Sequence, residues 1–562
     1  MTSRTTAFDP PSDLPDLLGR LVRRDPDATA VIDAGVGAVS RARLWQRTWL
    51  LVERLRAAGI GPGDCVAVWL PNWSDTLCWQ FAAAALGAHV VGVNTRYNVA
   101  EVVHVLDTAR PALIAVSHRF HRLDQRELLR VSVAQSAAPS PSVAVVAGPG
   151  QPAIDQAELA DYRVGPDCWA TGSFESGPPE DGSLAGGRSA PADPSRLAVA
   201  FTTSGSTGRP KLAAHRAAGV IGHALADAAA IGLSEDDVLL CAVPLAGTFG
   251  FSATMAAIAA GAAPLLAPVF DADAVLDDMV RHRVSHLAAG DDLVLRLEQA
   301  WRARPRDLSG WRWWGAADFQ GRLRELAGWA RTSFGTETTG LYGSSEVFAL
   351  TAMWPPEVPA PRRYERGGRP VSPDIEVRAV DPETGAPLAE GQEGELQFRG
   401  PNVVDAYLGN PSASTGAFTE DGWFASGDLG LLVPDGGFVH TCRMGDALRL
   451  RGFLVDPAEI ELRLAEHPAV RIAKVVGVPG SGGGTRAVGF VVLESGSAIG
   501  PSPAELRDWC ATALARFKVP DEVRVIAEMP TTSGTNGTKI RAATLREWAQ
   551  ESPIGKPGPS SR

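Results

Sequence analysis

Short apolar runs alternate with helical segments along much of this chain. Residues 64–70 (DCVAVWL) and 89–95 (HVVGVNT) are apolar enough to be buried strands, and residues 74–87 between them have the composition of a helix. Similar runs recur up to residue 148 and again between residues 196 and 343. Buried strands separated by helices are typical of βαβ units. The sequence therefore predicts an α/β fold in which βα layers are built on mostly parallel sheets.

The character of the sequence changes after about residue 370, where short β-like runs and turns dominate before a compact α+β segment. A chain of 562 residues exceeds what one hydrophobic core normally supports. We therefore expect a large N-terminal domain over residues 1–443, which includes a β-rich subdomain, and a smaller α+β C-terminal lid domain over residues 447–551. Residues 170–195 are predicted to be a mobile surface loop and residues 552–562 a disordered tail.

The composition argues against several classes of protein. A net charge of −11 disfavours nucleic-acid binding, so any phosphate site has to be local. The six cysteines form no CxxC pair, which favours a reducing compartment over a disulfide or zinc framework. We see no signal peptide at the N-terminus and no apolar run of about 18 residues that would span a membrane. A cytoplasmic protein is expected.

Residues 202–215 (TTSGSTGRPKLAAH) combine glycines, hydroxyl side chains and a lysine directly after a strand-like run. By composition alone, such a stretch is also compatible with a solvated linker. Ordering it costs conformational entropy, which a bound ligand would offset. Backbone N–H groups, hydroxyls and Lys211 offer suitable donors to phosphate oxygens. The spacing is not that of a P-loop, and a second glycine-rich stretch, residues 480–485, is predicted to be a hairpin loop.

Five further motifs follow this loop in order. They are LYGSSE (341–346), GELQFRG (394–400), GWFASGDLG (422–430), RMGDALRLRGFLVDPAEIE (443–461) and TNGTKIR (535–541). Over roughly residues 20–550 the chain thereby resembles the adenylate-forming superfamily of acyl-CoA synthetases, peptide-synthetase adenylation domains and firefly-type luciferases. The resemblance implies that a carboxylate attacks the α-phosphorus of ATP, pyrophosphate leaves and an acyl-adenylate forms. Because two anions meet in this step, the enzyme has to neutralise charge and align the reactants.

The resemblance also implies three catalytic residues. Lys539 would bridge the substrate carboxylate and the α-phosphate, and we prefer it to Lys518 for this role. Glu346 would be the metal ligand, because Mg²⁺ favours hard oxygen donors. Thr207 would donate to the phosphates from the glycine-rich loop.

The implied ATP site draws on several separate segments. Asp428 would accept the two ribose hydroxyls, since a carboxylate offers two oxygens to two donors. Arg443 would reach the ribose or the phosphates, and Tyr342 would flank the adenine ring opposite residues 315–317. The predicted ATP-binding residues are Thr203, Ser204, Gly205, Ser206, Thr207, Gly208, Lys211, Gly315, Ala316, Ala317, Tyr342, Gly343, Ser344, Ser345, Asp428 and Arg443.

The acyl pocket is expected at the stretches around residues 244–254, 290–293 and 314–320. Many acyl-CoA synthetases carry a histidine or a bulky aromatic in the first stretch, where this chain has small residues, so more room or a different gate is implied. A medium-to-large apolar acid fits best. Asp291 would suit a polar or amine-bearing acid, but capping of the following helix is the favoured alternative for this residue. The predicted pocket residues are Ala246, Gly247, Phe249, Phe251, Asp291, Trp314 and Gly315.

The superfamily rotates its C-terminal lid after adenylation, and the hinge here is expected near Gly445. Arg449 and Arg451 are two residues apart on an extended stretch, so they share a face that would meet the phosphates of CoA, with Gly452 beside them. A solvated arginine pair is the alternative.

The sequence thus predicts an ATP- and Mg²⁺-dependent ligase that joins a carboxylic acid to CoA. An amide-bond synthetase that passes the acyl group to an amine is the nearest alternative, and loading of a carrier protein stays open. A non-catalytic adenylate-binding regulator is the alternative from another class. The motifs identify neither the acid nor the oligomeric state, and a homodimer is compatible with them.

Overall fold

The protein is described here by a computed structural model. It describes residues 10–121, 124–171, 190–203, 210–319, 321–445, 448–450, 453–455, 457–480, 485–494, 500–514, 516, 518–534 and 537–550, without the side chains of 449, 453–454, 532–534 and 537–539. The predicted tail, most of the predicted 170–195 loop, and Ser204, Gly205, Ser206, Thr207, Gly208, Arg451 and Gly452 lie outside the described residues.

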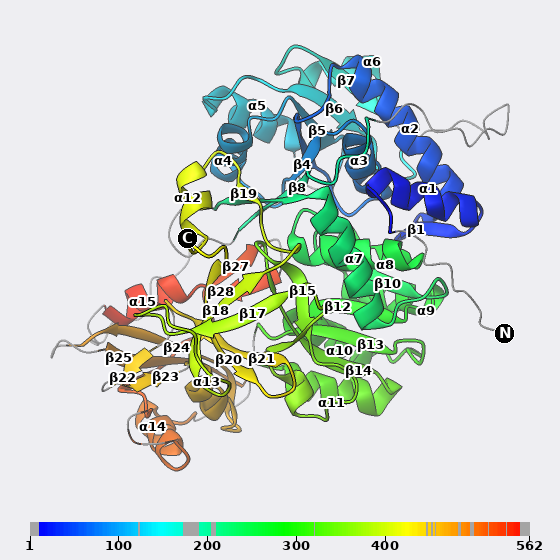
Figure 1. The fold of residues 1–562 in the computed structure, drawn as a ribbon. Coiled ribbons are helices and arrows are strands. Elements are labelled where there is room, and N and C mark those ends of the chain that lie inside the picture. The colour runs from blue at the N-terminus through cyan, green and yellow to red at the C-terminus, as the bar shows by residue number, and fades with distance from the viewer. Residues whose placement is uncertain are drawn as a thin grey trace, which may run out of the picture.

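The first sheet forms the upper part of the molecule in Figure 1. Its strands run in the order β19 (Ala406–Tyr407), β9 (Leu212–Arg216), β8 (Leu197–Thr202), β4 (His89–Gly92), β3 (Cys65–Trp69), β5 (Leu113–Ser117), β6 (Ser142–Val146) and β7 (Cys168–Thr171). From β8 to β7 neighbouring strands are parallel, and β9 and β19 add antiparallel pairs at one edge. The predicted parallel βα layers are confirmed.

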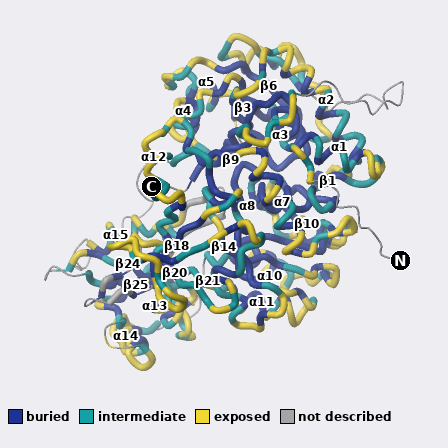
Figure 2. Tube along the Cα trace, viewed as in Figure 1, coloured by how far each residue is buried: buried dark blue, intermediate teal, exposed yellow. Residues whose placement is uncertain are grey.

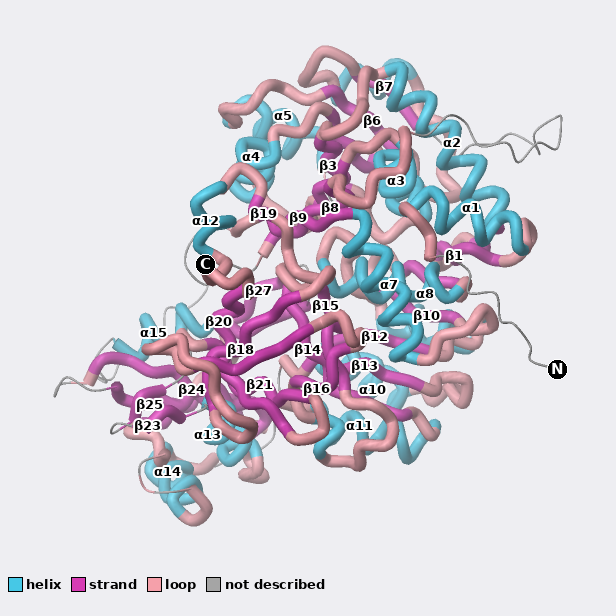
Figure 3. Tube along the Cα trace, viewed as in Figure 1, coloured by secondary structure: helices cyan, strands magenta, loops and turns pink. Residues whose placement is uncertain are grey.

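The second sheet changes character along its length. It runs in the order β17 (Glu376–Val380), β18 (Glu393–Arg399), β20 (Phe424–Val433), β21 (Gly437–Arg443), β16 (Gly367–Pro370), β15 (Phe348–Met353), β14 (Glu337–Ser344), β13 (Trp313–Ala317), β12 (His286–Gly290), β10 (Val238–Cys241), β11 (Ala263–Leu266), β1 (Thr29–Asp33) and β2 (Gly37–Ser40). The strands from β14 to β1 are parallel, whereas those from β15 to β17 are antiparallel and form the β-rich part. Figure 3 shows these strands continuing from the α/β region toward the small domain.

Helices cover both sheets of the large domain. They are α1 (Leu14–Arg24), α2 (Arg41–Ala57), α3 (Ser74–Ala85), α4 (Val99–Ala109), α5 (Gln125–Gln135), α6 (Gln156–Leu159), α7 (Ala217–Ile231), α8 (Thr248–Ala260), α9 (Ala272–Arg281), α10 (Asp291–Ala303), α11 (Leu323–Phe334) and α12 (Pro411–Gly416). Among the described residues, no helix combines the length and the apolar character needed to span a membrane.

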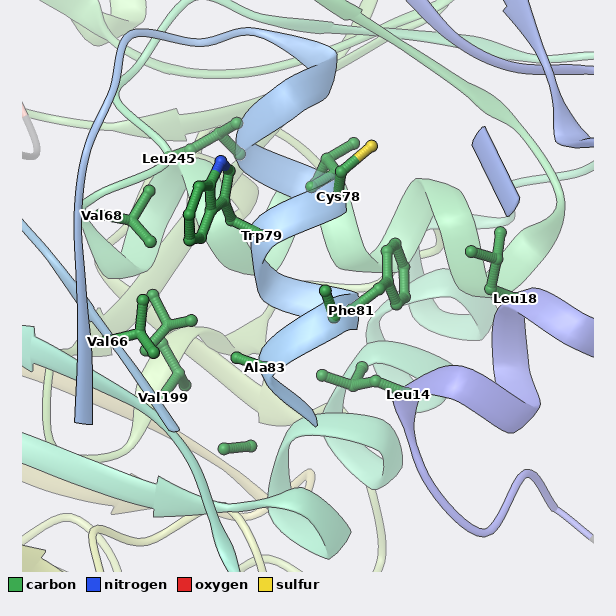
Figure 4. Packing of buried hydrophobic residues seen from close by; sticks show 14 of the residues in the cluster. Leu14, Leu18, Val66, Val68, Cys78, Trp79, Phe81, Ala83, Val199 and Leu245 are labelled. Atoms are coloured by element: carbon green, nitrogen blue, oxygen red, sulfur yellow. The ribbon is translucent and has the colours of Figure 1, made fainter. Parts of the chain in front are cut away.

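Helix α3 lies between the two sheets and is apolar on nearly every side. It contacts β3, β4 and β8 of the first sheet and β1 of the second. Figure 4 shows Trp79 pointing toward Val68 and Leu245, whereas Phe81 points toward Leu14 of α1. Because a helix buried all round needs no polar face, its sequence shows little amphipathic pattern. Figure 2 shows in dark blue that α3, β9 and α8 are buried along most of their length.

The small domain is an α+β unit at the lower left of Figure 1. Its elements are β22 (Leu448–Leu450), β23 (Phe453–Val455), α13 (Pro457–Ala465), β24 (Val470–Pro479), β25 (Thr485–Leu493), α14 (Pro503–Ala511), β26 (Glu522–Val525), β27 (Thr531–Gly534), β28 (Gly537–Ile540) and α15 (Ala542–Gln550). β24 and β25 pair antiparallel, as expected for strands on either side of a hairpin loop. Leu448 and Leu450 belong to the core of this domain, and the boundary between residues 443 and 447 stays a prediction.

Candidate active site

Lys211 and Glu346 both contact the side chain of Tyr407, one at the face of its ring and the other at its hydroxyl. Lys211 immediately precedes β9, and its Nζ lies 4.6 Å from the centre of the Tyr407 ring. The hydroxyl of Tyr407 donates a hydrogen bond of 3.1 Å to Glu346 Oε1. A cation above an aromatic face and a hydroxyl on a carboxylate are both favourable contacts. The structure therefore brings a lysine and a glutamate from distant motifs into one cluster.

The stem of the glycine-rich loop is closed by backbone contacts. The N–H of Thr203 donates to the carbonyl of Lys211 at 2.8 Å, and the N–H of Lys211 donates to Thr203 Oγ1 at 3.1 Å. β19 pairs antiparallel with β9, which sets Tyr407 opposite Ala213 and beside this stem. The loop thus begins and ends next to Tyr407.

Glu346 lies in the turn that joins β14 to β15. Its own N–H donates to Ser344 Oγ at 3.1 Å, and its carbonyl accepts a bond of 2.6 Å from the N–H of Val404. Ser345 Oγ lies 3.4 Å from the carbonyl of Thr202, the last residue of β8. These contacts hold the turn, with Glu346 half-buried and Gly343 exposed, against the strand that leads into the glycine-rich loop.

Asp428 is the centre of a second polar cluster. The hydroxyl of Tyr342 donates to Asp428 Oδ2 at 2.6 Å, and Arg443 Nε lies 3.2 Å from Asp428 Oδ1. His440 Nε2 lies 3.6 Å from the same Oδ1. The antiparallel register of β20 and β21 places Asp428 opposite Arg443, so their pairing follows from the sheet itself.

The charge states of this cluster follow from its surroundings. Burial alone would raise the pKa of the Asp428 carboxyl, but His440, Arg443 and the Tyr342 hydroxyl outweigh burial and hold that pKa below its usual value. Burial and the neighbouring carboxylate raise the pKa of Tyr342, so its hydroxyl stays a donor. Burial and Glu346 likewise raise the pKa of Tyr407, while the charge of Arg443 opposes that shift. Tyr342 and Tyr407 also belong to one cluster of buried side chains, so the two polar clusters adjoin.

The predicted adenine-flanking residues lie on neighbouring strands. Gly315, Ala316 and Ala317 form the carboxyl half of β13, beside β14. The ring of Tyr342 stacks on Phe398 at 5.4 Å between centroids and is 6% exposed. A Cβ on Gly315 would overlap the indole of Trp313, so a glycine is required there. The role of these residues at adenine stays a prediction.

Ala246 and Phe251 line the same small apolar cavity. The cavity lies between α3, the first sheet and the segment that follows β10, and Phe201 of β8 also borders it. The rings of Phe201 and Phe251 are 5.2 Å apart and meet edge-on. Gly247 directly precedes α8, whereas Phe249 packs into the core of the second sheet. The cavity measures only about 20 Å³, and Thr76 and Gln80 add polar groups to its mostly apolar wall, so entry of an acyl group here stays a prediction.

Trp314 and Asp291 are engaged in internal contacts. Trp314 is fully buried, and its Nε1–H donates to the carbonyl of Ala289 at 3.1 Å. Asp291 is fully buried as well, and its carboxylate accepts the N–H groups of Phe319 and Arg322, both at 3.0 Å. We therefore remove both residues from the proposed pocket wall. Because neighbours on a strand face opposite sides, Trp313 is the tryptophan that shares the face of Gly315.

The small domain brings its predicted lysine strand to the large domain. Lys539 lies on β28, opposite Thr532 of β27, and β28 contacts α10. Because α10 follows β12, the strand of Lys539 lies against the α/β part of the large domain that also carries the predicted acyl segment at residues 290–293. Lys518 instead forms an ion pair of 2.6 Å with Glu459 inside the small domain, which supports our preference for Lys539. The backbone of Arg449 pairs with Leu454.

Two residues of the site were not predicted. Tyr407 joins Lys211 to Glu346, and His215 donates from Nε2 to the carbonyl of Ser345 at 2.7 Å. No local pattern marks either residue, because each contact depends on strands that are far apart in the sequence.

Comparison with known proteins now bears directly on these motifs. The sequence model for the AMP-binding enzyme matches residues 19–408, and the one for the AMP-binding enzyme C-terminal domain matches residues 459–535. The chain belongs to the AMP-binding enzyme family. This AMP-binding enzyme is 31% identical to 3-[(3aS,4S,7aS)-7a-methyl-1,5-dioxo-octahydro-1H-inden-4-yl]propanoyl:CoA ligase of Mycobacterium tuberculosis, over 95% of its own length and 98% of the relative.

Two solved structures share its architecture. ATP-bound MatB from Rhodopseudomonas palustris is 25% identical with a TM-score of 0.79, and the match covers 96% of this chain and 99% of MatB. The amide bond synthetase McbA from Marinactinospora thermotolerans is 26% identical with a TM-score of 0.77, over 95% and 99% of the two chains. These findings confirm the predicted superfamily, the fold with its large and small domains, and the enzyme class, an AMP-forming acid–thiol ligase.

Proposed function

We propose that this AMP-binding enzyme converts a medium-to-large apolar carboxylic acid to its acyl-adenylate with ATP and then transfers the acyl group to CoA. The observation that carries the proposal is the meeting of the two clusters. Lys211, Tyr407 and Glu346 adjoin Tyr342, Asp428 and Arg443, so residues from four separate motifs face one region.

Asp428 has enough hydrogen-bond acceptor positions to bind both hydroxyls of a ribose. An ionised carboxylate offers about four acceptor positions. Tyr342 and Arg443 each occupy one of them, at 2.6 Å and 3.2 Å, whereas His440 Nε2, at 3.6 Å from Oδ1, lies beyond hydrogen-bond distance. Two positions then remain for the 2′- and 3′-hydroxyls, and the lowered pKa of Asp428 keeps both oxygens able to accept at neutral pH.

The phosphates of ATP would lie between Lys211 and Glu346. The ammonium of Lys211 neutralises phosphate charge, and Glu346 supplies a hard oxygen suited to Mg²⁺. Within the described part of the chain, no three His, Cys, Asp or Glu side chains gather as a metal site, so Mg²⁺ would be shared between Glu346 and phosphate oxygens. When bound, the metal would withdraw charge from the leaving pyrophosphate.

Lys539 is proposed to bridge the acid and the α-phosphate. A cation placed between two anions lowers the repulsion that opposes attack of one on the other. The contact of β28 with α10 supports this placement, because α10 begins within the predicted acyl segment at residues 290–293.

The substrate class rests on the walls of the cavity and on the relative. Ala246, Phe201 and Phe251 are apolar, and no charged residue is among those that line the described cavity, which measures about 20 Å³ and would have to widen to admit the acid. The mycobacterial relative is named for an acid that carries a bicyclic ring. An apolar acid with a ring or a branched chain is therefore our first choice.

Transfer to an amine is the second candidate, because the structural similarity to McbA is nearly as high as that to MatB. The test is a panel of carboxylic acids read by pyrophosphate release, first without an acceptor and then with CoA or with amines. Thioester formation supports the proposal, amide formation favours the alternative, and absence of pyrophosphate with every acid refutes both.

We also propose a cytoplasmic location, in keeping with six cysteines that are all free thiols. A homodimer stays a prediction, which light scattering after size-exclusion chromatography would test.

A further inference from the structure

The segment that carries Glu346 is held in an unfavourable backbone conformation. Phe348 and Leu350 follow Glu346 closely and have φ angles of +64° and +67°. Residues with a side chain pay roughly 1–2 kcal/mol for this left-handed conformation, and they keep it only where the surroundings impose it. Something therefore holds this segment in place.

Five successive carbonyls of this segment, from Ser345 to Ala349, each accept a hydrogen bond. The carbonyl of Glu346 accepts from the N–H of Val404 at 2.6 Å, and that of Val347 from Asn402 Nδ2 at 3.0 Å. The carbonyl of Phe348 accepts from Thr351 Oγ1 at 2.9 Å. The first and last of the five are bonded by histidines.

Two buried imidazoles supply the outer anchors. His215, in β9, donates from Nε2 to the carbonyl of Ser345 at 2.7 Å, and His223, in α7, donates from Nε2 to the carbonyl of Ala349 at 2.8 Å. The ring of Phe348 stacks on both, with centroids 4.0 Å from His215 and 4.8 Å from His223. The two histidines therefore hold the segment by its carbonyls and by its aromatic side chain.

Both imidazoles act as neutral donors. A carbonyl only accepts, so each Nε2 carries the proton, and Nδ1 of each ring is buried with no partner among the described residues. Burial lowers the pKa of both His215 and His223 to about 4. Asp227 Oδ2 lies 3.1 Å from His223 Nε2, and burial raises the pKa of that carboxyl well above its usual value. Burial thus disfavours the charged form of all three side chains.

We propose that His215 and His223 are positioning residues that fix Glu346 relative to Lys211. His215 is central, because the strand that carries it starts directly after Lys211, and its side chain is bonded next to Glu346. The inference rests on the proposed function, in which Lys211 and Glu346 serve the same phosphates and metal.

The test compares His215→Leu, which removes the donor, with His215→Gln, which keeps an N–H at a similar reach. His223→Leu and His223→Gln form a second pair, and His89→Leu is the matched control, since His89 is also buried but lies on β4. The first readout is the Mg²⁺ concentration that gives half-maximal pyrophosphate release. The second is thioester formation from CoA and a chemically prepared acyl-adenylate, which needs neither ATP nor pyrophosphate exchange.

Both leucine variants should raise the half-saturating Mg²⁺ concentration by roughly 10- to 100-fold, while the transfer from acyl-adenylate is retained. The glutamine variants should recover most of this loss, and His89→Leu should leave the Mg²⁺ dependence unchanged. Equal loss of both half-reactions would show a merely structural role and overturn the inference. So would Mg²⁺ dependence like that of the wild type in both leucine variants.

Failure of the proposed function is separable from failure of this inference. A wild-type enzyme that releases no pyrophosphate with any acid refutes the function. Calorimetry with ATP, in the presence and absence of Mg²⁺, still tests the positioning role, because His215→Leu should lose the preference for Mg²⁺-bound ATP. Retention of that preference would overturn it.

Discussion

Replacement of Asp428 by asparagine would isolate the contribution of one ionised carboxylate to ATP binding. The side chain is 6% exposed and already bonded to Tyr342 and Arg443, so the shape of the site is retained while its acceptors change. The amide oxygen accepts two hydrogen bonds, and the amide NH₂ accepts none. With one position still used by Tyr342 or Arg443, at most one remains for the ribose.

The expected magnitude follows from that loss. A hydrogen bond to a charged group contributes about 1.5–3 kcal/mol, and one such bond to the ribose disappears. Because about 1.4 kcal/mol corresponds to a tenfold change in affinity, the KM for ATP should rise by roughly 10- to 150-fold. The KM for the acid should change little, because the predicted acyl segments lie elsewhere.

The assay is pyrophosphate release at varied ATP concentration with a saturating acid. Asp421→Asn is the matched control, because Asp421 lies in the same β-rich part but is exposed and pairs with Arg378. Asp428→Asn with the KM for ATP of the wild type, or with a loss in the acid KM of equal size, would refute the ribose assignment.

Three further predictions concern other parts of the site. Lys539→Ala should abolish adenylation yet leave ATP affinity nearly intact by calorimetry, and an equal loss of ATP affinity would contradict its bridging role. Tyr407→Phe keeps the ring beside Lys211 but removes the hydrogen bond to Glu346. The half-saturating Mg²⁺ concentration should therefore rise severalfold in the pyrophosphate assay. An unchanged value would count against a role of Tyr407 in positioning Glu346. The pKa of His215 falls from 6.5 to about 4 on folding, so its contribution to the free energy of unfolding is present above pH 6.5 and is lost as the pH falls toward 4. Urea denaturation at pH 7 and pH 5 should show a smaller acid loss in His215→Gln than in the wild type, and equal losses would argue against this origin.

Local sequence signals predicted the layers well. Apolar runs such as residues 64–70 and 89–95 became β3 and β4, since a parallel strand buried on both faces has to be apolar throughout. Asp428 and Arg443 lie in separate motifs that were both singled out, and the β20–β21 ladder then placed them face to face.

The errors and omissions concern residues whose position depends on packing between segments that are far apart in the sequence. The contact of Tyr407 with Lys211 requires the pairing of β19 with β9, which no window of sequence reveals. We predicted Trp314 as a pocket residue. Strand periodicity places Trp313 and Trp314 on opposite faces of the sheet, but it does not tell which face packs against the core. Asp291 was expected either to meet substrate or to cap its own helix, yet it accepts two N–H groups ahead of α11.

Phe201 links the proposed acyl cavity to the packed rings of His215 and Phe348, which matters for attempts to change the accepted acid. Its ring borders the cavity that we propose for the acyl group and lies 6.0 Å from His215 and 6.3 Å from Phe348. A substitution that changes the size of this ring would also disturb its packing against the two residues that, in our proposal, help to position Glu346 for the metal. Engineered variants with a new acid preference should therefore be screened for altered magnesium demand as well as for turnover, because Phe201 contacts both the proposed acyl cavity and the residues proposed to position Glu346.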